Sequence, residues 1–297
     1  MSATIQWSGT VRALSSVAHG GEQRGTIMAL RRETVIQPDG RAVLVPIISG
    51  NSWRGRLRRI GEELLRDALG YEGELELAAA HALRGGGSLA RTSAEPLSGR
   101  RLQELRLLIP QVGVFGCAAG GRIIDGCLRV GKVVPQIAET AHILAGPASE
   151  MPWIRATQLE TYLRQDDTSQ HAFADLVGVV PVDVDESGAP LFGAVEAGAG
   201  TERMLMFRVE TFPAGTTFET WLRLDRATPR EVAFFADVLA QFSAEGRLGG
   251  RVGIGHGQVA LNLEQRRVAG VEPTPVDWRR ELVEHRDQAM NVLRYLT

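Results

Sequence analysis

Four arginines stand within residues 54–59, directly after the segment Gly50-Asn51-Ser52-Trp53. Asn51 or Ser52 can cap a helix, and the apolar residues that follow have helical spacing, so the arginines fall in the first two turns of a predicted helix. A helix N-terminus carries a partial positive charge and free N–H groups, which makes it unfavourable for arginine side chains. A bound phosphate would resolve this conflict, because it accepts hydrogen bonds from both kinds of group.

Ion pairs within the same helix would explain part of this cluster without a ligand. Arg58 and Arg59 each have a glutamate four residues further along, and such pairs stabilise a helix by about 0.2–0.5 kcal/mol each. Arg54 and Arg56 have no acidic residue at that spacing. We therefore favour phosphate binding and keep the internal ion pairs as the alternative.

Glycines open two further segments to a ligand. The segment LGGRVGIGHG at residues 248–257 is not a dinucleotide loop, because Gln258 replaces the third glycine and the loop follows a predicted helix. Its glycines can expose the backbone to a ligand, with Arg251 and His256 beside it. His19 stands in a similar glycine loop, which favours ligand contact over core packing. The alternative for 248–257 is a tight connection between a helix and a strand.

Other patterns predict neither a metal site, nor a cofactor, nor covalent catalysis. GCLRVGKV at 126–133 resembles a P-loop, but Val133 replaces the hydroxyl residue that binds magnesium. The six histidines form no HExxH motif and no cluster with the two cysteines, and no GxSxG occurs. Cys117 and Cys127 fit a reducing cytoplasm better than a disulfide scaffold. No apolar run is long enough to span a membrane, so we expect a cytoplasmic protein without membrane contact.

The net charge of −2 hides an uneven distribution. Residues 1–60 carry nine arginines and three acidic residues, whereas residues 136–200 carry two arginines and ten acidic residues. A basic end indicates an anionic ligand, or head-to-tail packing of like subunits with the basic face on the acidic one. A solvated mixture of both signs is the alternative.

The hydrophobic pattern predicts alternating strands and helices. Strands are expected at 3–14, 26–36, 42–48, 121–135 and 258–264, with a hairpin at 203–224 that turns at 213–216. Helices are expected after Asn51, at 74–83, 228–246 and 277–296, and loops at 15–25 and 84–99. The order is the β-α-β-β-α-β pattern of an α+β, ferredoxin-like (RRM-like) fold, in which an antiparallel sheet has its helices on one face. The acidic residues 136–200 are expected to form an insertion with little core of its own.

Five segments, in this order along the chain, resemble the motifs of the RAMP (repeat-associated mysterious protein) superfamily of CRISPR-associated proteins. They are VAHGGE (17–22), IISGNSWRGRLR (47–58), VGVFG (112–116), ETFPAGTTFETWLRL (210–224) and LGGRVGIGHGQV (248–259). Within the superfamily, the chain is most similar to the repeated backbone subunit that coats the crRNA in effector complexes. It resembles the type IV subunits more than the type III ones.

The resemblance implies a ferredoxin-like palm, residues 1–135 and 201–297 with peripheral helices, and an inserted thumb-like region, residues 136–200. It implies subunits that form a head-to-tail helical filament on crRNA or another small guide RNA. Other CRISPR effector subunits and complementary target nucleic acid are the further implied partners. The predicted RNA-binding residues are His19, Gly20, Gly21, Arg24, Gly50, Asn51, Ser52, Trp53, Arg54, Arg58, Arg59, Arg251, Gly253, Gly255, His256 and Gly257.

One departure from the family bears on catalysis. Type III backbone subunits carry an RNA-cleaving aspartate after the first strand, whereas residues 19–32 contain none. We therefore expect no catalytic residue and a subunit that is not an enzyme. The alternative is an endoribonuclease of the same superfamily that processes precursor crRNA with His19 or His256 as general base. A small-molecule enzyme with a ferredoxin-like core is a third possibility.

Overall fold

The protein is described by a computed structural model that covers residues 2–87, 97–119, 122–164 and 205–296. Its central sheet contains β1 (Ala3–Ala13), β8 (Leu128–Val130), β12 (Thr217–Ala227) and β13 (Val259–Gly270), and β9 (Val134–Pro135) also pairs with β12. The order β13-β1-β12-β8 is antiparallel throughout. With α1 (Gly50–Leu69) after β1 and α5 (Pro229–Glu245) after β12, the topology is β-α-β-β-α-β. The predicted ferredoxin-like fold is confirmed.

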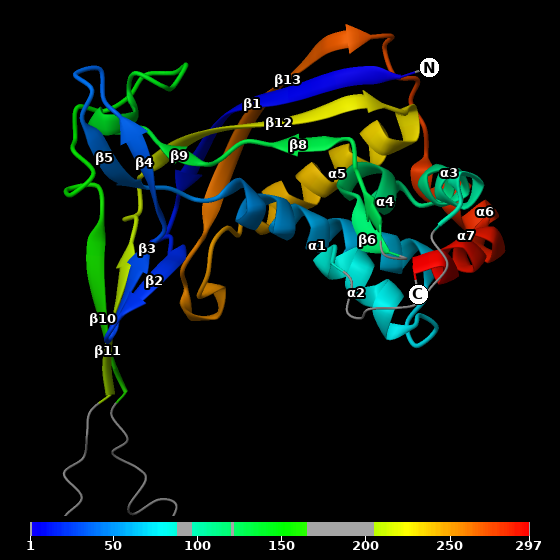
Figure 1. The fold of residues 1–297 in the computed structure, drawn as a ribbon, viewed down its shortest axis with the longest axis horizontal. Coiled ribbons are helices and arrows are strands. Elements are labelled where there is room, and N and C mark those ends of the chain that lie inside the picture. Colours follow the sequence, from blue (N-terminus) through cyan, green and yellow to red (C-terminus); the bar gives the residue numbers. More distant parts are fainter. Residues whose placement is uncertain (1, 88–96, 120–121, 165–204, 297) are drawn as a thin grey trace, which may run out of the picture.

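Alternation along β1 explains why both helices lie on one face of this sheet. Ile5, Trp7 and Val11 are buried, while the residues between them are more exposed. Trp7 packs edge-on against Phe235 of α5, with ring centroids 5.2 Å apart. Figure 1 shows α1, α4 and α5 on the same side of the sheet. The other face has no helix over it in this view.

Helices gather at the end of the molecule that holds both termini (Figure 1). They are α2 (Leu77–Gly85), α3 (Gly99–Leu108), α4 (Pro110–Phe115), α6 (Trp278–Glu284), α7 (Arg286–Leu293) and the 3₁₀ turn η3 (Arg294–Leu296). A short ribbon of β6 (Cys117–Ala119) and β7 (Arg122–Ile124) lies beside them. The predicted terminal helix is divided at His285, and the apolar segment 105–116 is helical.

A second lobe stands at the opposite end in Figure 1. Its sheet has the order β10-β11-β3-β2, formed by β2 (Gly20–Arg24), β3 (Ile27–Leu30), β10 (Gln158–Arg164) and β11 (Leu205–Thr211). Beside it, β4 (Arg32–Ile36) pairs with β5 (Ala42–Pro46). The 3₁₀ turn η1 (Ala138–Thr140) follows β9 in the chain. The predicted loop 15–25 therefore contains a strand, and the predicted strand 26–36 is two strands that separate at Arg31.

The boundary between palm and thumb differs from the prediction for the described residues. The lobe joins residues 20–46 of the predicted palm to residues 136–164 of the predicted insertion. These parts share a small core of Val45, Ile47, Ile137 and Ala156. Residues 165–200, the larger part of the predicted insertion, lie outside the described residues.

The predicted hairpin at 203–224 is wrong in its pairing. Both strands exist, but β11 pairs with β10 and β3, whereas β12 pairs with β1, β8 and β9. The reason is that residues 212–216 pair with the end of β1 and the segment after it. The Ala13 N–H donates to Thr216 O (2.8 Å), and Val17 pairs with Phe212. Residues 212–216 thus pass from one sheet to the other. Within the described segments, no helix combines the length and apolar character that crossing a membrane requires.

Candidate nucleic-acid interface

Three segments of the predicted site meet at the start of α1. Ser49 caps this helix, because its Oγ accepts a hydrogen bond from the Ser52 N–H (3.2 Å). The Ser49 N–H in turn donates to His19 Nε2 (3.2 Å). The Gly250 N–H donates to Ala18 O (2.7 Å), which places the glycine loop beside the same segment. The cap thus lies two or three residues before the predicted one, and the three segments come together.

Arginines line a hollow of about 520 Å³ at this point. Arg54 donates to the carbonyl oxygens of Leu128 (2.8 Å) and Phe115 (2.7 Å). Arg58 donates to those of Gly116 (2.6 Å) and Phe115 (2.7 Å). The other residues that line the hollow are Asn51, Ser52, Gly55, Arg59, Gly85, Gly86 and Gly87.

The two guanidinium groups keep their charge although they are fixed by neutral partners. Burial, and then the neighbouring Arg54, lower the pKa of Arg58 to about 10. Burial and Arg129 likewise lower the pKa of Arg54. Both groups stay protonated at neutral pH, and none of the ion pairs formed by the described residues includes Arg54, Arg58 or Arg59. The hollow is therefore a region of positive potential.

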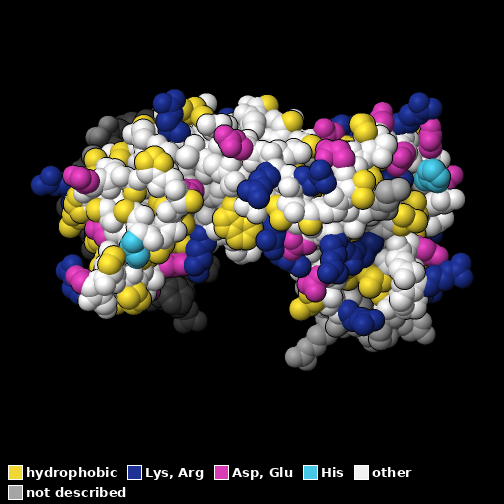
Figure 2. Space-filling model, turned by 90° about the horizontal axis from the view of Figure 1, so that it is seen from above, with side chains coloured by type: hydrophobic (Ala, Val, Ile, Leu, Met, Phe, Trp, Pro, Cys, Tyr) yellow, Lys and Arg dark blue, Asp and Glu magenta, His cyan; other side chains and the backbone are white. Residues whose placement is uncertain are grey.

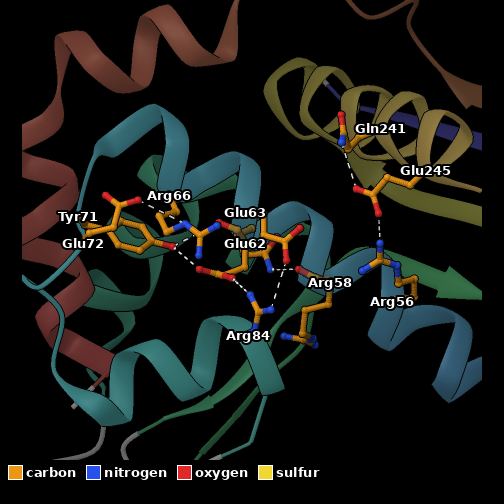
Figure 3. A network of polar contacts seen from close by, with 11 residues as sticks. Arg56, Arg58, Glu62, Glu63, Arg66, Tyr71, Glu72, Arg84, Gln241 and Glu245 are labelled. Carbon is orange, nitrogen blue, oxygen red and sulfur yellow. Dashed lines mark hydrogen bonds and ion pairs between the residues drawn. The ribbon is translucent and has the colours of Figure 1, made fainter. Parts of the chain in front are cut away.

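The ion pairs that were the alternative explanation, Arg58–Glu62 and Arg59–Glu63, are not formed. Glu62 and Glu63 both pair with Arg84 of α2, the latter at 3.3 Å, and Glu62 also accepts from the Tyr71 hydroxyl (3.1 Å). Figure 3 shows the Arg58 guanidinium pointing away from these carboxylates. Arg56 pairs with Glu245 of α5 instead.

Two exposed arginines lie near Arg56, one of them in the lining of the hollow and the other outside that lining. Arg59 and Arg247 are exposed, and both lower the pKa of Arg56 after the larger effect of burial, so both lie close to it. The sequence analysis missed Arg247, although a basic residue directly before a glycine loop was a usable signal. Figure 2 shows the face of the molecule hollowed between the two lobes, with Lys and Arg side chains along the rim.

The glycine loop divides into an exposed part and a buried part. Gly253 and Gly255 are exposed within and after the 3₁₀ turn η2 (Val252–Ile254). Gly257 is buried with φ +79°, and a Cβ there would lie 2.3 Å from Leu248 O. Arg251 is half-buried, and its guanidinium lies 4.9 Å from the Phe207 ring centroid. Of these glycines, Gly253 and Gly255 expose their backbone to a ligand, whereas Gly257 does not.

Four predicted RNA-binding residues are buried, and we correct their assignment. Trp53 is 0% exposed and packs against Phe242, with centroids 4.5 Å apart. Arg58 is 8% exposed and braces main-chain carbonyls. His256 is buried, with Nδ1 2.9 Å from Ser16 Oγ and Nε2 against the Tyr162 hydroxyl. Gly257 allows the close approach of two backbone segments.

The remaining predicted residues whose burial is described lie at or near the surface. Asn51 and Arg59 are exposed, as are Gly20 and Gly21 in β2. Gly50 is half-buried and lies against Gly131, since a Cβ on Gly50 would lie 3.1 Å from Gly131 O. Arg24 ends β2, and its side chain lies outside the description. No three His, Cys, Asp or Glu side chains of the described segments are grouped so that they could hold a metal ion.

A carboxylate network joins the second lobe to the palm beside the glycine loop. Glu160 accepts hydrogen bonds from Thr211 Oγ1 (2.8 Å), Gln158 Nε2 (2.9 Å) and the Tyr162 hydroxyl (2.9 Å). Burial by itself would raise the pKa of Glu160, but hydrogen bonds from these residues and Ser16 lower it to about 2. The ionised carboxylate therefore stabilises the contact between β10, β11 and the palm.

The fold and this surface define an α+β protein with a ferredoxin-like palm, whose cationic groups gather at the start of the first palm helix. The model of the RAMP superfamily matches residues 10–260, and the chain belongs to this superfamily. A solved chain described as "Type IV-B CRISPR Complex" has 36% sequence identity and a TM-score of 0.60, covering 93% of this chain and 98% of that chain. The resemblance found in the sequence is thereby confirmed. No curated protein matches the chain.

Replacing Arg58 and Arg59 in turn separates a structural arginine from a surface one. Arg58→Ala removes the guanidinium donor to Gly116 O and one of the two guanidinium donors to Phe115 O, and we expect it to lower the free energy of unfolding by about 1–3 kcal/mol. Arg59→Ala, one residue away and exposed, should change it by no more than about 0.5 kcal/mol. Urea unfolding followed by circular dichroism measures both. Equal losses of unfolding free energy in the two variants would show that the hydrogen bonds of Arg58 to residues 115 and 116 do not stabilise the fold.

Glu160→Gln tests the network beside the glycine loop. Because the folded-state pKa lies below the usual 4.5, the ionised carboxylate adds stability above pH 4.5, and this contribution is lost as the pH falls towards 2. The difference in unfolding free energy between the wild type and Glu160→Gln should therefore shrink over that range. Urea titrations at several pH values measure it. A difference that stays constant with pH would contradict the assignment.

Proposed function

We propose that this chain is a non-catalytic, RNA-binding backbone subunit of a type IV CRISPR ribonucleoprotein effector complex, which coats the crRNA as a head-to-tail filament. The observation that carries the proposal is the hollow at the start of α1. There Arg54 and Arg58 are charged and fixed by carbonyl oxygens, with exposed Arg59 beside them. The likeness to a chain from a type IV-B CRISPR complex supports it.

The geometry suits a sugar-phosphate backbone rather than particular bases. Phosphate contacts give affinity and register without reading sequence, and a guide-coating subunit must accept any spacer. Arg59 and Arg247 are exposed and both lie close to Arg56, so a strand can continue from the hollow towards the glycine loop that follows Arg247. Exposed Gly253 and Gly255 let a backbone approach there. Copies of the chain, other effector subunits and complementary target nucleic acid in the cytoplasm are the partners of such a subunit.

The positions of the two candidate histidines support a binding role over catalysis. A general base needs a free lone pair within reach of the proton that it removes. Both ring nitrogens of buried His256 contact hydroxyl groups, those of Ser16 and Tyr162. The Nε2 lone pair of His19 accepts from the Ser49 N–H, and burial and Arg31 lower the pKa of His19. Neither ring is placed to activate a ribose hydroxyl.

The double variant Arg59→Ala/Arg247→Ala tests the RNA path. Each lost phosphate contact should lower the slope of log K against log salt by about 0.7 for single-stranded RNA, hence by about 1.4 for the pair. Filter binding at several salt concentrations measures the slope. Arg100→Ala/Arg280→Ala is the matched control, since it removes two exposed charges from α3 and α6 at the helical end. An equal loss in both double variants would show a net-charge effect and refute the path.

Incubation with repeat-containing precursor RNA tests the absence of catalysis. We expect the wild-type protein to leave the RNA intact, with and without EDTA, and His19→Ala to change nothing. Denaturing gels give the readout. Discrete cleavage by the wild type that His19→Ala abolishes would instead establish the endoribonuclease.

A further inference from the structure

The helix-free face of the palm sheet carries an exposed tryptophan at its centre. Trp221 lies on β12, between β1 and β8, and is 41% exposed. Its neighbour across β1 is Ser8, and on the other side Gly131 approaches so closely that a Cβ would lie 2.7 Å from Trp221 Nε1. Small neighbours on both sides leave the indole uncovered and fix its position.

Arginines form a row across the same face, next to Trp221. Arg223 follows two residues later on β12, and it pairs in register with Arg129 of β8 and Gln6 of β1. Gln6 is in turn paired with Arg266 of β13. Residues two apart on a strand point to the same face about 6.6 Å apart. The Trp221 and Arg223 side chains therefore occupy neighbouring positions on the same face of the sheet.

The charges in this row are only partly compensated. Asp225 is shared by Arg223 (2.7 Å) and Arg129 (3.5 Å), so one carboxylate faces two guanidinium groups. Arg266 is exposed. Glu219, in the next row along β12, accepts hydrogen bonds from the N–H groups of Ala145 (3.0 Å) and Gly146 (2.8 Å). Two of the three arginines of this row thus share the single carboxylate of Asp225, while Glu264, across Ser8 from Trp221, adds a negative charge in the neighbouring row.

A groove of about 560 Å³ lies next to this row, and its lining includes Trp221, the segment 145–147 and the carboxylates Glu219 and Glu264, but none of the three arginines. The row of arginines also connects with the hollow at α1. Arg129 is close enough to Arg54 to lower its pKa, and Arg54 binds Leu128 O, the carbonyl directly before Arg129. The two positive surfaces meet at β8, the edge of the sheet.

We infer that the open sheet face, centred on Trp221 and Arg223, is a second binding surface for single-stranded nucleic acid, distinct from the guide path at α1. A base stacks on Trp221 while Arg223, Arg129 and Arg266 contact phosphates. Aromatic side chains on an antiparallel sheet recognise unpaired bases by stacking, which accepts every base because each has a π face. The ligand is an unpaired strand, since the bases of a duplex are already stacked on each other.

Variants at Trp221 test this inference with a short fluorescein-labelled oligouridine as probe. Trp221→Ala should weaken binding about five- to 150-fold, as the loss of one stacked base predicts. Trp221→Phe keeps an aromatic ring and should retain most of the affinity, whereas Trp221→Leu is apolar without a ring and should behave like Trp221→Ala. Fluorescence anisotropy measures the affinities, and circular dichroism checks that each variant is folded. Equal affinity for all variants and the wild type would overturn the inference.

Salt dependence separates stacking from charge. Trp221→Ala should leave the salt slope unchanged, whereas Arg223→Gln should lower it by about 0.7. Oligothymidine DNA should respond to both variants like RNA, and an RNA duplex should respond to neither. If Trp221→Ala altered the sedimentation of the protein but not its nucleic-acid affinity, the face would be a protein interface and the inference would be wrong.

A combined variant keeps this test independent of the proposed function. The fold-change caused by Trp221→Ala is measured again in the Arg59→Ala/Arg247→Ala background. Two separate surfaces predict the same fold-change in both backgrounds. If Arg59 and Arg247 proved irrelevant, the Trp221 effect would stand alone. If only Trp221 proved irrelevant, the guide path would remain and the second surface would be refuted.

Discussion

The contact between two arginines of α1 and three main-chain carbonyls holds the palm and its positive surface together. Arg54 and Arg58 reach from α1 to Phe115 and Gly116 at the end of α4 and to Leu128 at the start of β8. Gly116 has φ +61°, and a Cβ there would lie 2.1 Å from Ile124 O, so the α4–β6 turn has little freedom. Charge-assisted hydrogen bonds to buried carbonyls fix this turn against the helix, and losing them would leave those carbonyls unpaired.

The same contact prepares the surface for an anion. A carbonyl oxygen orients a guanidinium group without cancelling its charge, whereas a carboxylate would cancel it. The carboxylates nearest in sequence, Glu62 and Glu63, form ion pairs with Arg84 and not with Arg58 or Arg59. Glu245 forms its ion pair with Arg56. Arginines fixed in this way have already lost their rotamer freedom, so binding a phosphate would cost less entropy than with free side chains. Burial of Arg58 thus contributes to binding indirectly, through the potential in the hollow.

Local patterns predicted the elements well, and long-range contacts explain the errors. The helix α5 was predicted at 228–246, and its capping box of Thr228 and Glu231, with Pro229 between them, has all its partners within one turn. The roles of Arg58 and His256 could not be predicted, since their partners are the carbonyls of residues 115–116 and side chains 94 and 240 positions away. The false hairpin at 203–224 arose similarly, because a proline-glycine turn gives no sign that a third segment takes the pairing edge. Spacing along the chain therefore located the site but could not distinguish its buried structural arginine, Arg58, from an exposed one such as Arg59.

The topology itself explains why one small palm can present two positive surfaces. Both crossover helices of the β-α-β-β-α-β fold cover the same face, so the hydrophobic alternation of β1 and β12 buries one side and leaves the other free. The strand β8 lies at the edge of the sheet, with only β12 as a neighbour. The Leu128 side chain is buried on the helix side, while Arg129, the next residue, faces the open side, because successive side chains point to opposite faces. The Leu128 carbonyl, which accepts from Arg54, belongs to the same edge strand. Alternation along one edge strand is enough to bring the two surfaces into electrostatic contact.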